Sequence, residues 1–158
     1  PNGSVAQLIT DKIGATGEKM QLGYYEYITA PHVTSYIHMG NKLATVVGFN
    51  KAEVDEHVAK DVAMQVAAMN PIAVNPEGIP AEVKEKELEI AREKAREAGK
   101  PENLIDRIAE GSLQKFYKDS SLLQQEYVKD PKKTIEQFLK ENDKELSVTT
   151  FKRVSLNV

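Results

Sequence analysis

Three polar side chains spaced one helical turn apart are the first candidates for chemistry in this chain. His57, Asp61 and Gln65 follow one another at intervals of four residues, so a helix would place them in one row. An imidazole and a carboxylate on adjacent turns are both metal ligands, but a metal ion needs more ligands than these two. The remaining histidines lie in segments without an acidic cluster. We therefore expect no metal site, and expect the row to be either the polar margin of a packed helix or a face that meets a partner.

The sequence contains no arrangement typical of a catalytic nucleophile. Ser120 and Ser121 follow one another in a predicted loop, without a nearby histidine or a Gly-x-Ser-x-Gly motif. The chain has no cysteine, which excludes cysteine catalysis, disulfides and thiolate zinc sites. Its nine glycines nowhere form a loop that would cradle phosphates. We expect no catalytic residue and no cofactor, and therefore a protein that is not an enzyme.

Three tyrosines near the N-terminus could in principle stack on nucleotide bases. Tyr24, Tyr25 and Tyr27 lie in a predicted strand, but few basic residues surround them. The formal net charge of the chain is −3, which disfavours direct binding of nucleic acid or of an anionic membrane. We expect these rings to pack in the core or on a face of the sheet.

Alternating hydrophobicity predicts the strands. Residues 20–29 alternate with a period of two, and residues 33–39 and 42–49 flank Gly40-Asn41, which is typical of a two-residue hairpin turn. Residues 147–156 predict a last strand that pairs with the earlier ones. The segment between residues 119 and 129 is predicted to be mostly irregular.

Helical spacing and capping residues predict the core helices. Ser4 with Gln7 indicates the start of a first helix, which Gly14 and Gly17 are expected to close. Asn50 is the expected N-cap of a second helix, and Thr134 of a short one that runs to about residue 140. The second helix carries an unbroken apolar ridge made of Val54, Val58, Val62 and Val66.

The segment from residue 80 to residue 118 predicts a charged helical hairpin. Eleven of the sixteen residues from 82 to 97 are charged. An apolar seam nevertheless runs through them, formed by Leu88, Ala91, Ala95 and Ala98. Gly99-Lys100-Pro101 ends one helix and starts the next. The returning helix has an apolar stripe of its own, made of Leu104, Ile105, Ile108, Ala109, Leu113, Phe116 and Tyr117.

These elements predict an α+β fold: a three- to four-stranded antiparallel sheet with helices on one face and a protruding antiparallel helical hairpin. The expected division is a core in two parts, residues 1–79 and 119–158, with an arm at residues 80–118 between them. A chain of 158 residues can bury one such core and carry an appendage. No apolar run is long enough to span a membrane and no signal peptide is present, so we expect a cytoplasmic protein. Because the first residue is Pro1 and not Met, we expect a piece of a longer protein.

Six stretches, in consistent order along nearly the whole chain, resemble the C-terminal part of the bacterial translation elongation factor Ts family. They are residues 5–14 (VAQLITDKIG), 35–38 (SYIH), 61–71 (DVAMQVAAMNP), 99–101 (GKP), 110–116 (EGSLQKF) and 122–131 (LLQQEYVKDP). The blocks DVAMQVAA and GKP with EG and KF are specific in combination, whereas any one alone is a weak signal.

The chain also departs from the family pattern. Gly17-Glu18-Lys19 is followed by Gly23-Tyr24-Tyr25 where family members commonly carry paired arginines, and Ala44 stands where the family often has glycine. The N-terminal helical domain of the family and its Thr-Asp-Phe-Val motif are not in these 158 residues. The chain is therefore similar to the second half of the family's core together with its coiled-coil arm.

The resemblance implies guanine-nucleotide exchange on elongation factor Tu, with this chain providing contact surfaces. It implies that Leu43 and Ala44, at the start of a strand, touch the partner, together with Asp61 and Gln65 on the second helix. Gln65 is expected on an exposed flank because it lies off the valine ridge. The alternative is a non-catalytic scaffolding domain whose arm binds a partner helix or a second copy of the chain as a homodimer.

Overall fold

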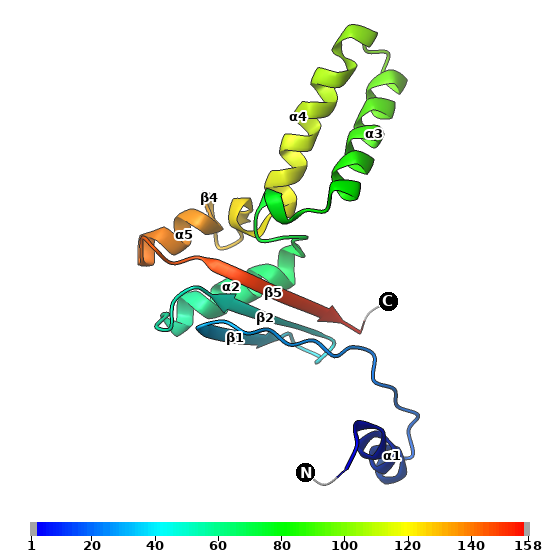
Figure 1. Cartoon of the computed structure of the whole chain (residues 1–158), viewed down its shortest axis with the longest axis vertical. Coiled ribbons are helices and arrows are strands. Elements are labelled where there is room, and N and C mark those ends of the chain that lie inside the picture. Colours follow the sequence, from blue (N-terminus) through cyan, green and yellow to red (C-terminus); the bar gives the residue numbers. More distant parts are fainter. Residues whose placement is uncertain (1–2, 157–158) are drawn as a thin grey trace.

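A computed structural model of the chain, which describes residues 3–156, shows a small α+β core from which a helical hairpin protrudes (Figure 1). The predicted fold class is confirmed. Its elements in chain order are α1 (Val5–Thr16), β1 (His32–Ile37), β2 (Leu43–Phe49), α2 (Glu56–Met69), η1 (Pro76–Gly78), α3 (Ala81–Glu97), α4 (Glu102–Ser120), η2 (Leu122–Gln124), β3 (Glu126–Tyr127), β4 (Asp130–Thr134), α5 (Ile135–Asn142) and β5 (Val148–Ser155).

The main sheet has three antiparallel strands in the order β1-β2-β5. Strand β5 returns from the end of the chain to pair with β2, where Ala44 lies opposite Val154. Helix α2 packs against β1 and β2. Because side chains alternate along a strand, Thr45, Val47 and Phe49 all point toward α2 and are buried. The core is the layer between this sheet face, α2 and the C-terminal elements.

The β1–β2 hairpin is confirmed, but its predicted two-residue turn is wrong. Gly40 and Asn41 both have positive φ, of 86° and 55°. They lie inside a longer loop, which the backbone bond from His38 N to Leu43 O (2.9 Å) closes. The local preference for left-handed backbone was therefore placed correctly, but the loop is longer than two residues, since the last pair of β1 and β2 is Ile37 with Ala44.

The strand predicted at residues 20–29 is wrong. Residues 19–30 are described throughout, and they have no regular secondary structure. The segment runs past the sheet face that lies opposite α2, where a Cβ atom on Gly48 would lie 2.7 Å from the Cβ of Ala30. Glycine at position 48 thus permits this close approach. Alternating hydrophobicity alone does not make a strand, because a strand also needs a neighbour that pairs with its backbone.

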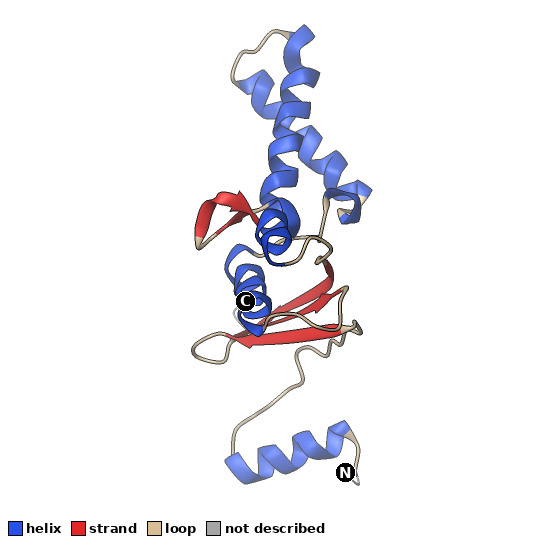
Figure 2. Cartoon of the chain, turned by 90° about the vertical axis from the view of Figure 1, so that its left-hand side faces the viewer, coloured by secondary structure: helices blue, strands red, loops and turns tan. Residues whose placement is uncertain are grey.

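Helix α1 begins at the predicted cap but lies apart from the core (Figures 1 and 2). Of the two glycines predicted to close it, Gly17 ends the helix, whereas Gly14 lies inside it. Ser4 accepts a hydrogen bond from Gln7 N, and Gly17 ends the helix in the left-handed region with φ of 72°. Within residues 3–156, no side chain of α1 is buried. The exposed fractions of Val5 and Leu8 are 58% and 56%, whereas Ile9 and Ile13 are half-buried, so much of its apolar stripe is accessible.

Helix α2 begins later than predicted. The N-cap is Asp55, whose carboxylate accepts from His57 N (2.9 Å) and Val58 N (3.2 Å), and not Asn50. The Asn50 side chain instead forms hydrogen bonds with the segment that precedes β5, donating to Glu145 O and accepting from Ser147 N. The valine ridge is confirmed from the helix start onward, and its residues join the main core cluster. That cluster contains Val47, Phe49, Val58, Ala59, Val62, Ala63, Val66, Leu122, Tyr127, Ile135, Leu139, Leu146 and Val148.

Helices α3 and α4 form the arm, an antiparallel pair that extends away from the sheet (Figures 1 and 2). Gly99 takes a φ of 70° at the tip. The side chains buried between the helices are mostly small, namely Ala91, Ala95, Ile105, Ala109 and Leu113. None of the helices in the described part of the chain has both the length and the apolarity that a membrane span requires.

The segment after the arm is more regular than predicted. Helix α4 continues to Ser120, and β3 and β4 then form a separate two-stranded hairpin. The predicted cap of α5 is confirmed: Thr134 and Gln137 form a reciprocal capping box. Leu139 of α5 is fully buried, so this short helix closes the core from the side of the hairpin.

Candidate partner-binding site

Leu43 and Ala44 lie at the start of β2, and both are half-buried. Ala44 is on the same face of the strand as Gly48, which is the face opposite α2. It lines a shallow hollow of about 230 Å³ together with Tyr24, Tyr25 and Val154. This end of the sheet is therefore accessible, and its surface is mainly apolar and aromatic.

Asp61 lies on the side of α2 that faces the β3–β4 hairpin. Its carboxylate accepts a hydrogen bond from the Tyr127 hydroxyl at 2.7 Å and lies 2.5 Å from the Lys129 ammonium. Burial, and then the hydrogen bond to Asp61, raise the pKa of the Tyr127 phenol. The Asp61 side chain is 22% exposed, so it is largely occupied by contacts within the chain.

Gln65 is fully buried, and the exposed position predicted for it is wrong. Its Nε2 donates to Gln125 Oε1 (3.3 Å) and to Glu126 O (3.0 Å), and its Oε1 accepts from Val128 N (3.0 Å). The row of polar side chains does lie off the valine ridge, as the spacing predicts. It faces a second layer of the same chain, because residues 125–128 cover this side of α2.

The four predicted residues thus occupy two places. Leu43 and Ala44 lie at one end of the sheet, and Ala44 points away from α2. Asp61 and Gln65 lie on the side of α2 that is turned toward β3, where they bond to residues 125–129. The packing of α2 on the sheet does not bring the two pairs together, because successive faces of a helix meet different neighbours.

The other candidates from the sequence do not form a chemical site. His57 is exposed, and across residues 3–156 no three side chains of His, Cys, Asp or Glu are grouped to hold a metal ion. The expectation that the three tyrosines pack in the core is wrong, although Tyr24 and Tyr25 do lie beside Ala44 on a face of the sheet. The exposed fractions of Tyr24, Tyr25 and Tyr27 are 54%, 79% and 75%.

Two residues near Asp61 and Gln65 were missed from the sequence. Tyr127 stacks on Phe138 with ring centroids 4.3 Å apart, and Gln125 is buried beside Gln65. Both lie in the segment that was predicted to be irregular. The sequence held no hydrophobic alternation that would have revealed them, since residues 125–128 read Gln-Glu-Tyr-Val, although their burial in the structure does alternate.

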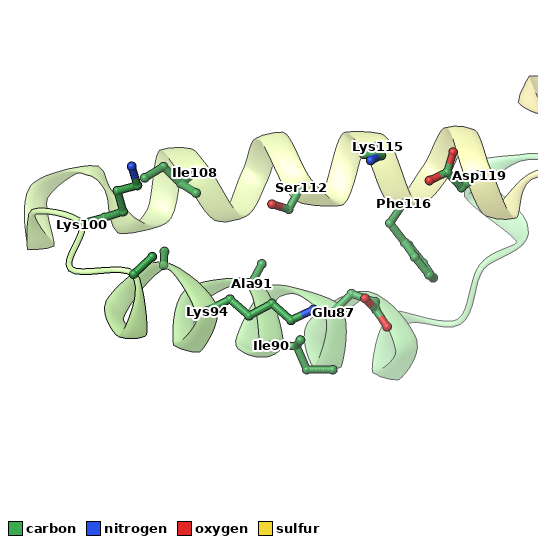
Figure 3. Close-up of a pocket in the computed structure, with 12 residues that line it drawn as sticks. Glu87, Ile90, Ala91, Lys94, Lys100, Ile108, Ser112, Lys115, Phe116 and Asp119 are labelled. Atoms are coloured by element: carbon green, nitrogen blue, oxygen red, sulfur yellow. The ribbon is translucent and has the colours of Figure 1, made fainter.

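A groove runs along one side of the arm (Figure 3). Its volume is about 510 Å³, and Ala91 and Ala95 of α3 form part of its lining. Ile108 and Phe116 project from α4 along the same groove, as the close-up shows. The small side chains of α3 leave room for apolar groups of another molecule.

Comparison with known proteins gives one consistent family. The family model described as Elongation factor TS matches residues 1–157. The relative named Elongation factor Ts from Porphyromonas gingivalis is 60% identical over 154 residues, which are 98% of this chain and 56% of the relative. Relatives of the same name from Azobacteroides pseudotrichonymphae and Christiangramia forsetii are 53% and 47% identical, and the match again covers 56% of each. The chain therefore spans little more than half the length of these curated relatives.

Proposed function

Because the chain belongs to the elongation factor Ts family, we propose that it is part of a guanine-nucleotide exchange factor that binds elongation factor Tu and promotes GDP release during translation elongation. The observation that carries this proposal is the family match over residues 1–157. The architecture supports it, since a small core with a projecting arm offers extended surfaces for a protein partner.

The physical basis of exchange is a difference in affinity. A factor that binds the nucleotide-free partner more tightly than the GDP-bound partner must, by linkage, lower the partner's affinity for GDP by the same factor. Such a factor needs surfaces that fit one state of the partner, and it needs no acid, base or nucleophile of its own. That this chain is not an enzyme and takes no cofactor therefore stays a prediction that agrees with the proposed mechanism.

The sheet end at Leu43 and Ala44 is the part of the proposed contact site that a partner can reach directly. Asp61 keeps part of its carboxylate exposed and belongs to the site through its contacts with the hairpin. Gln65 has no exposed surface, so its proposed contribution is to hold the backbone at Glu126 and Val128 in place.

The proposed division of labour follows the arrangement of the elements. Residues 1–79 and 119–158 would form the core that meets elongation factor Tu, and residues 80–118 would form an arm that extends the contact. The proposed place of action is the cytoplasm, with a protein partner and without direct contact to nucleic acid or membrane.

Isothermal titration against nucleotide-free elongation factor Tu tests this proposal. We expect the chain to bind, and Ala44→Glu to weaken binding about tenfold, since a charge placed in an apolar contact is costly. Thr149→Glu serves as the control because Thr149 is exposed on β5 near the opposite end of the sheet. Absence of binding by the unmodified chain would refute the proposed function. Equal losses in both variants would refute the proposed place of contact.

The alternative function is a scaffolding domain that self-associates, or binds a partner helix, through its arm. The groove between α3 and α4 is the observation that favours it. Sedimentation of the chain alone separates the two functions. Ala98 lines the groove and is exposed. A concentration-dependent dimer that Ala98→Glu abolishes would support self-association through the arm, whereas a monomer at all concentrations would exclude it.

A further inference from the structure

The arm and the β3–β4 hairpin meet α2 at a pair of buried glutamines. Gln65 belongs to α2, and Gln125 lies between η2 and β3. Their exposed fractions are 0% and 1%, and Gln65 Nε2 donates to Gln125 Oε1 at 3.3 Å. We call this pair the glutamine joint. Gln125 bonds to the last turn of α4, the helix that returns from the arm to the core (Figure 1).

One half of the joint connects two helix ends. Gln125 Nε2 donates to Asp119 O at 2.9 Å in the last turn of α4, and more weakly, at 3.5 Å, to Met69 O at the end of α2. Carbonyl groups in the last turn of a helix have no partner within the helix and need one elsewhere. A single side-chain amide therefore satisfies both the arm helix and the core helix.

The other half of the joint holds the hairpin. Gln65 Nε2 donates to Glu126 O, and its Oε1 accepts from Val128 N, both at 3.0 Å. Each of the two amide nitrogens thus faces two acceptors. Turning either amide over would set an oxygen against carbonyl oxygens, so the bonding pattern admits one orientation of each side chain.

The other attachments of the arm to the core lie at its base. Among the described elements, α4 packs mainly on α3 and on η2. The segment that enters the arm and the segment that leaves it are joined by backbone hydrogen bonds from Ile72 N to Ser120 O (2.8 Å) and from Leu122 N to Ala73 O (2.9 Å). Ala73, Ile79 and Leu122 are buried at this base, so apolar packing also holds it. The direction of the arm depends in addition on the polar contacts there, because a hydrogen bond weakens steeply when its angle changes.

We propose that Gln65 and Gln125 are positioning residues, which fix the direction of the arm and of the β3–β4 hairpin relative to α2. Without the Gln125 amide, Asp119 O and Met69 O lose their side-chain donor, and the arm can tilt to find water for them. The consequence for a partner rests on the proposed function. Surfaces held in a fixed geometry bind more tightly because binding does not have to order them first.

The distance between the arm tip and the core tests the proposal directly. The chain has no cysteine, so Lys100→Cys at the tip and Lys144→Cys before β5 give two unique sites for spin labels. We expect Gln125→Leu to widen the distance distribution measured by double electron–electron resonance about twofold, because the unpaired base opens locally. Gln65→Leu should act in the same direction.

Thr45→Val is the matched control. It removes a buried hydrogen bond between the sheet and α2, from Thr45 Oγ1 to Ala63 O at 2.9 Å, away from the joint. We expect it to lower the melting temperature but to leave the distance distribution unchanged. An unchanged distribution in Gln125→Leu, or equal widening in the control, would overturn the proposal.

Hydrogen exchange in the unmodified chain keeps the test decisive if the Gln125 variant does not fold. The Val128 amide, which bonds to Gln65 Oε1, should exchange within about tenfold of the Val47 amide in the central strand. Exchange about a thousandfold faster would show that the joint opens independently of the core and would overturn the proposal.

Binding measurements separate the joint from the proposed function. We expect Gln125→Leu to weaken binding to elongation factor Tu about tenfold more than Thr45→Val does, because the loosened surfaces must be ordered on binding. If the distance results hold and even the unmodified chain does not bind, the joint stands and the proposed function fails. If the chain binds and the distance distributions are equal in all variants, the positioning role of the glutamine joint is refuted and the proposed function is not.

Discussion

The phenol of Tyr127 donates a hydrogen bond of 2.7 Å to the carboxylate of Asp61, which connects the β3–β4 hairpin to α2 across 66 positions of sequence. The ring is 5% exposed and stacks on Phe138 of α5. Lys129 approaches the other oxygen of Asp61 from the hairpin. Asp61 therefore anchors the hairpin from one side of α2, and Gln65 anchors it one turn later.

Removing the phenol oxygen should weaken this anchor without disturbing the ring stack. Tyr127→Phe should lower the free energy of unfolding by about 1 kcal/mol, the usual net contribution of a hydrogen bond. Tyr25→Phe is the control, since Tyr25 is 79% exposed and should change nothing measurable. Urea denaturation measures both variants. Equal stability of Tyr127→Phe and the unmodified chain would mean that the bond to Asp61 adds no net stability.

The same pair predicts a dependence of stability on alkaline pH. The folded chain holds the pKa of Tyr127 above its ordinary value of 10.0, through burial and through the negative charge of Asp61. The neutral phenol is thus favoured in the fold, so its stabilising effect is complete below about pH 10 and is lost as the pH rises further, because the unfolded chain ionises first. Tyr127→Phe lacks this titration, and its stability should fall less steeply above pH 10. Urea titrations at pH 9 to 11 measure the free energy of unfolding of both chains. If it falls with pH equally steeply in both, Tyr127 is not the group that titrates.

The burial of Gln65 reverses the effect expected of an exposed flank position. Gln65→Ala leaves Glu126 O and Val128 N without their partner in a buried place, so the free energy of unfolding should fall by about 2–3 kcal/mol. Val62→Ala, on the adjacent face of the same helix, should cost about 1–3 kcal/mol through lost apolar contact. Urea denaturation of both variants measures the difference. A Gln65→Ala chain as stable as the unmodified one would show that these hydrogen bonds do not form in solution.

The features that the sequence predicted correctly are those that depend on neighbours along the chain. The cap at Thr134, the helix end at Gly17 and the charged pair of arm helices all arise from residues within one or two turns. The strand predicted at residues 20–29 failed because its alternation says nothing about whether a neighbouring strand exists. Asn50 failed as a cap because its amide bonds Ser147, about a hundred residues away.

The candidate site was only half predictable for the same reason. Spacing places Asp61 and Gln65 off the valine ridge, and the structure agrees. No local pattern shows that residues 125–129 cover that side of α2, since they arrive there only after the chain has passed through the whole arm. Polar residues beside an apolar ridge therefore meet either solvent or a polar layer of the same chain, and local sequence does not distinguish these two environments.

The arm should be the part of the fold that opens most readily outside α1. Its buried seam on α3 consists of Ala91 and Ala95, and burial stabilises by only about 25 cal/mol for each Å² of apolar surface. Hydrogen exchange should show α3 opening well before α2, whose valines are fully buried. Replacing residues 82–117 by a short Gly-Ser turn should leave the sheet folded, because that change retains the glutamine joint and the bonds from Ile72 to Ser120. Circular dichroism of the deletion variant measures whether the core stays folded. An unfolded spectrum would show that the core does not fold without the arm.

Exchange of nucleotide by the chain itself should be slow. These 158 residues match about 56% of the length of the curated relatives, and they do not contain the Thr-Asp-Phe-Val motif of the family. Exchange requires that contacts favour the nucleotide-free partner, and each tenfold acceleration corresponds to about 1.4 kcal/mol of that preference. A chain that retains only part of the contacts should bind elongation factor Tu weakly and release GDP slowly. Stopped-flow release of a fluorescent GDP, with the full-length relative from Porphyromonas gingivalis as the reference, should show rates at least about tenfold lower for this chain. If this chain and the full-length relative release GDP at equal rates at saturating concentration, the whole exchange function lies in these 158 residues. The end of the sheet at Leu43 and Ala44 would then be the first surface to mutate.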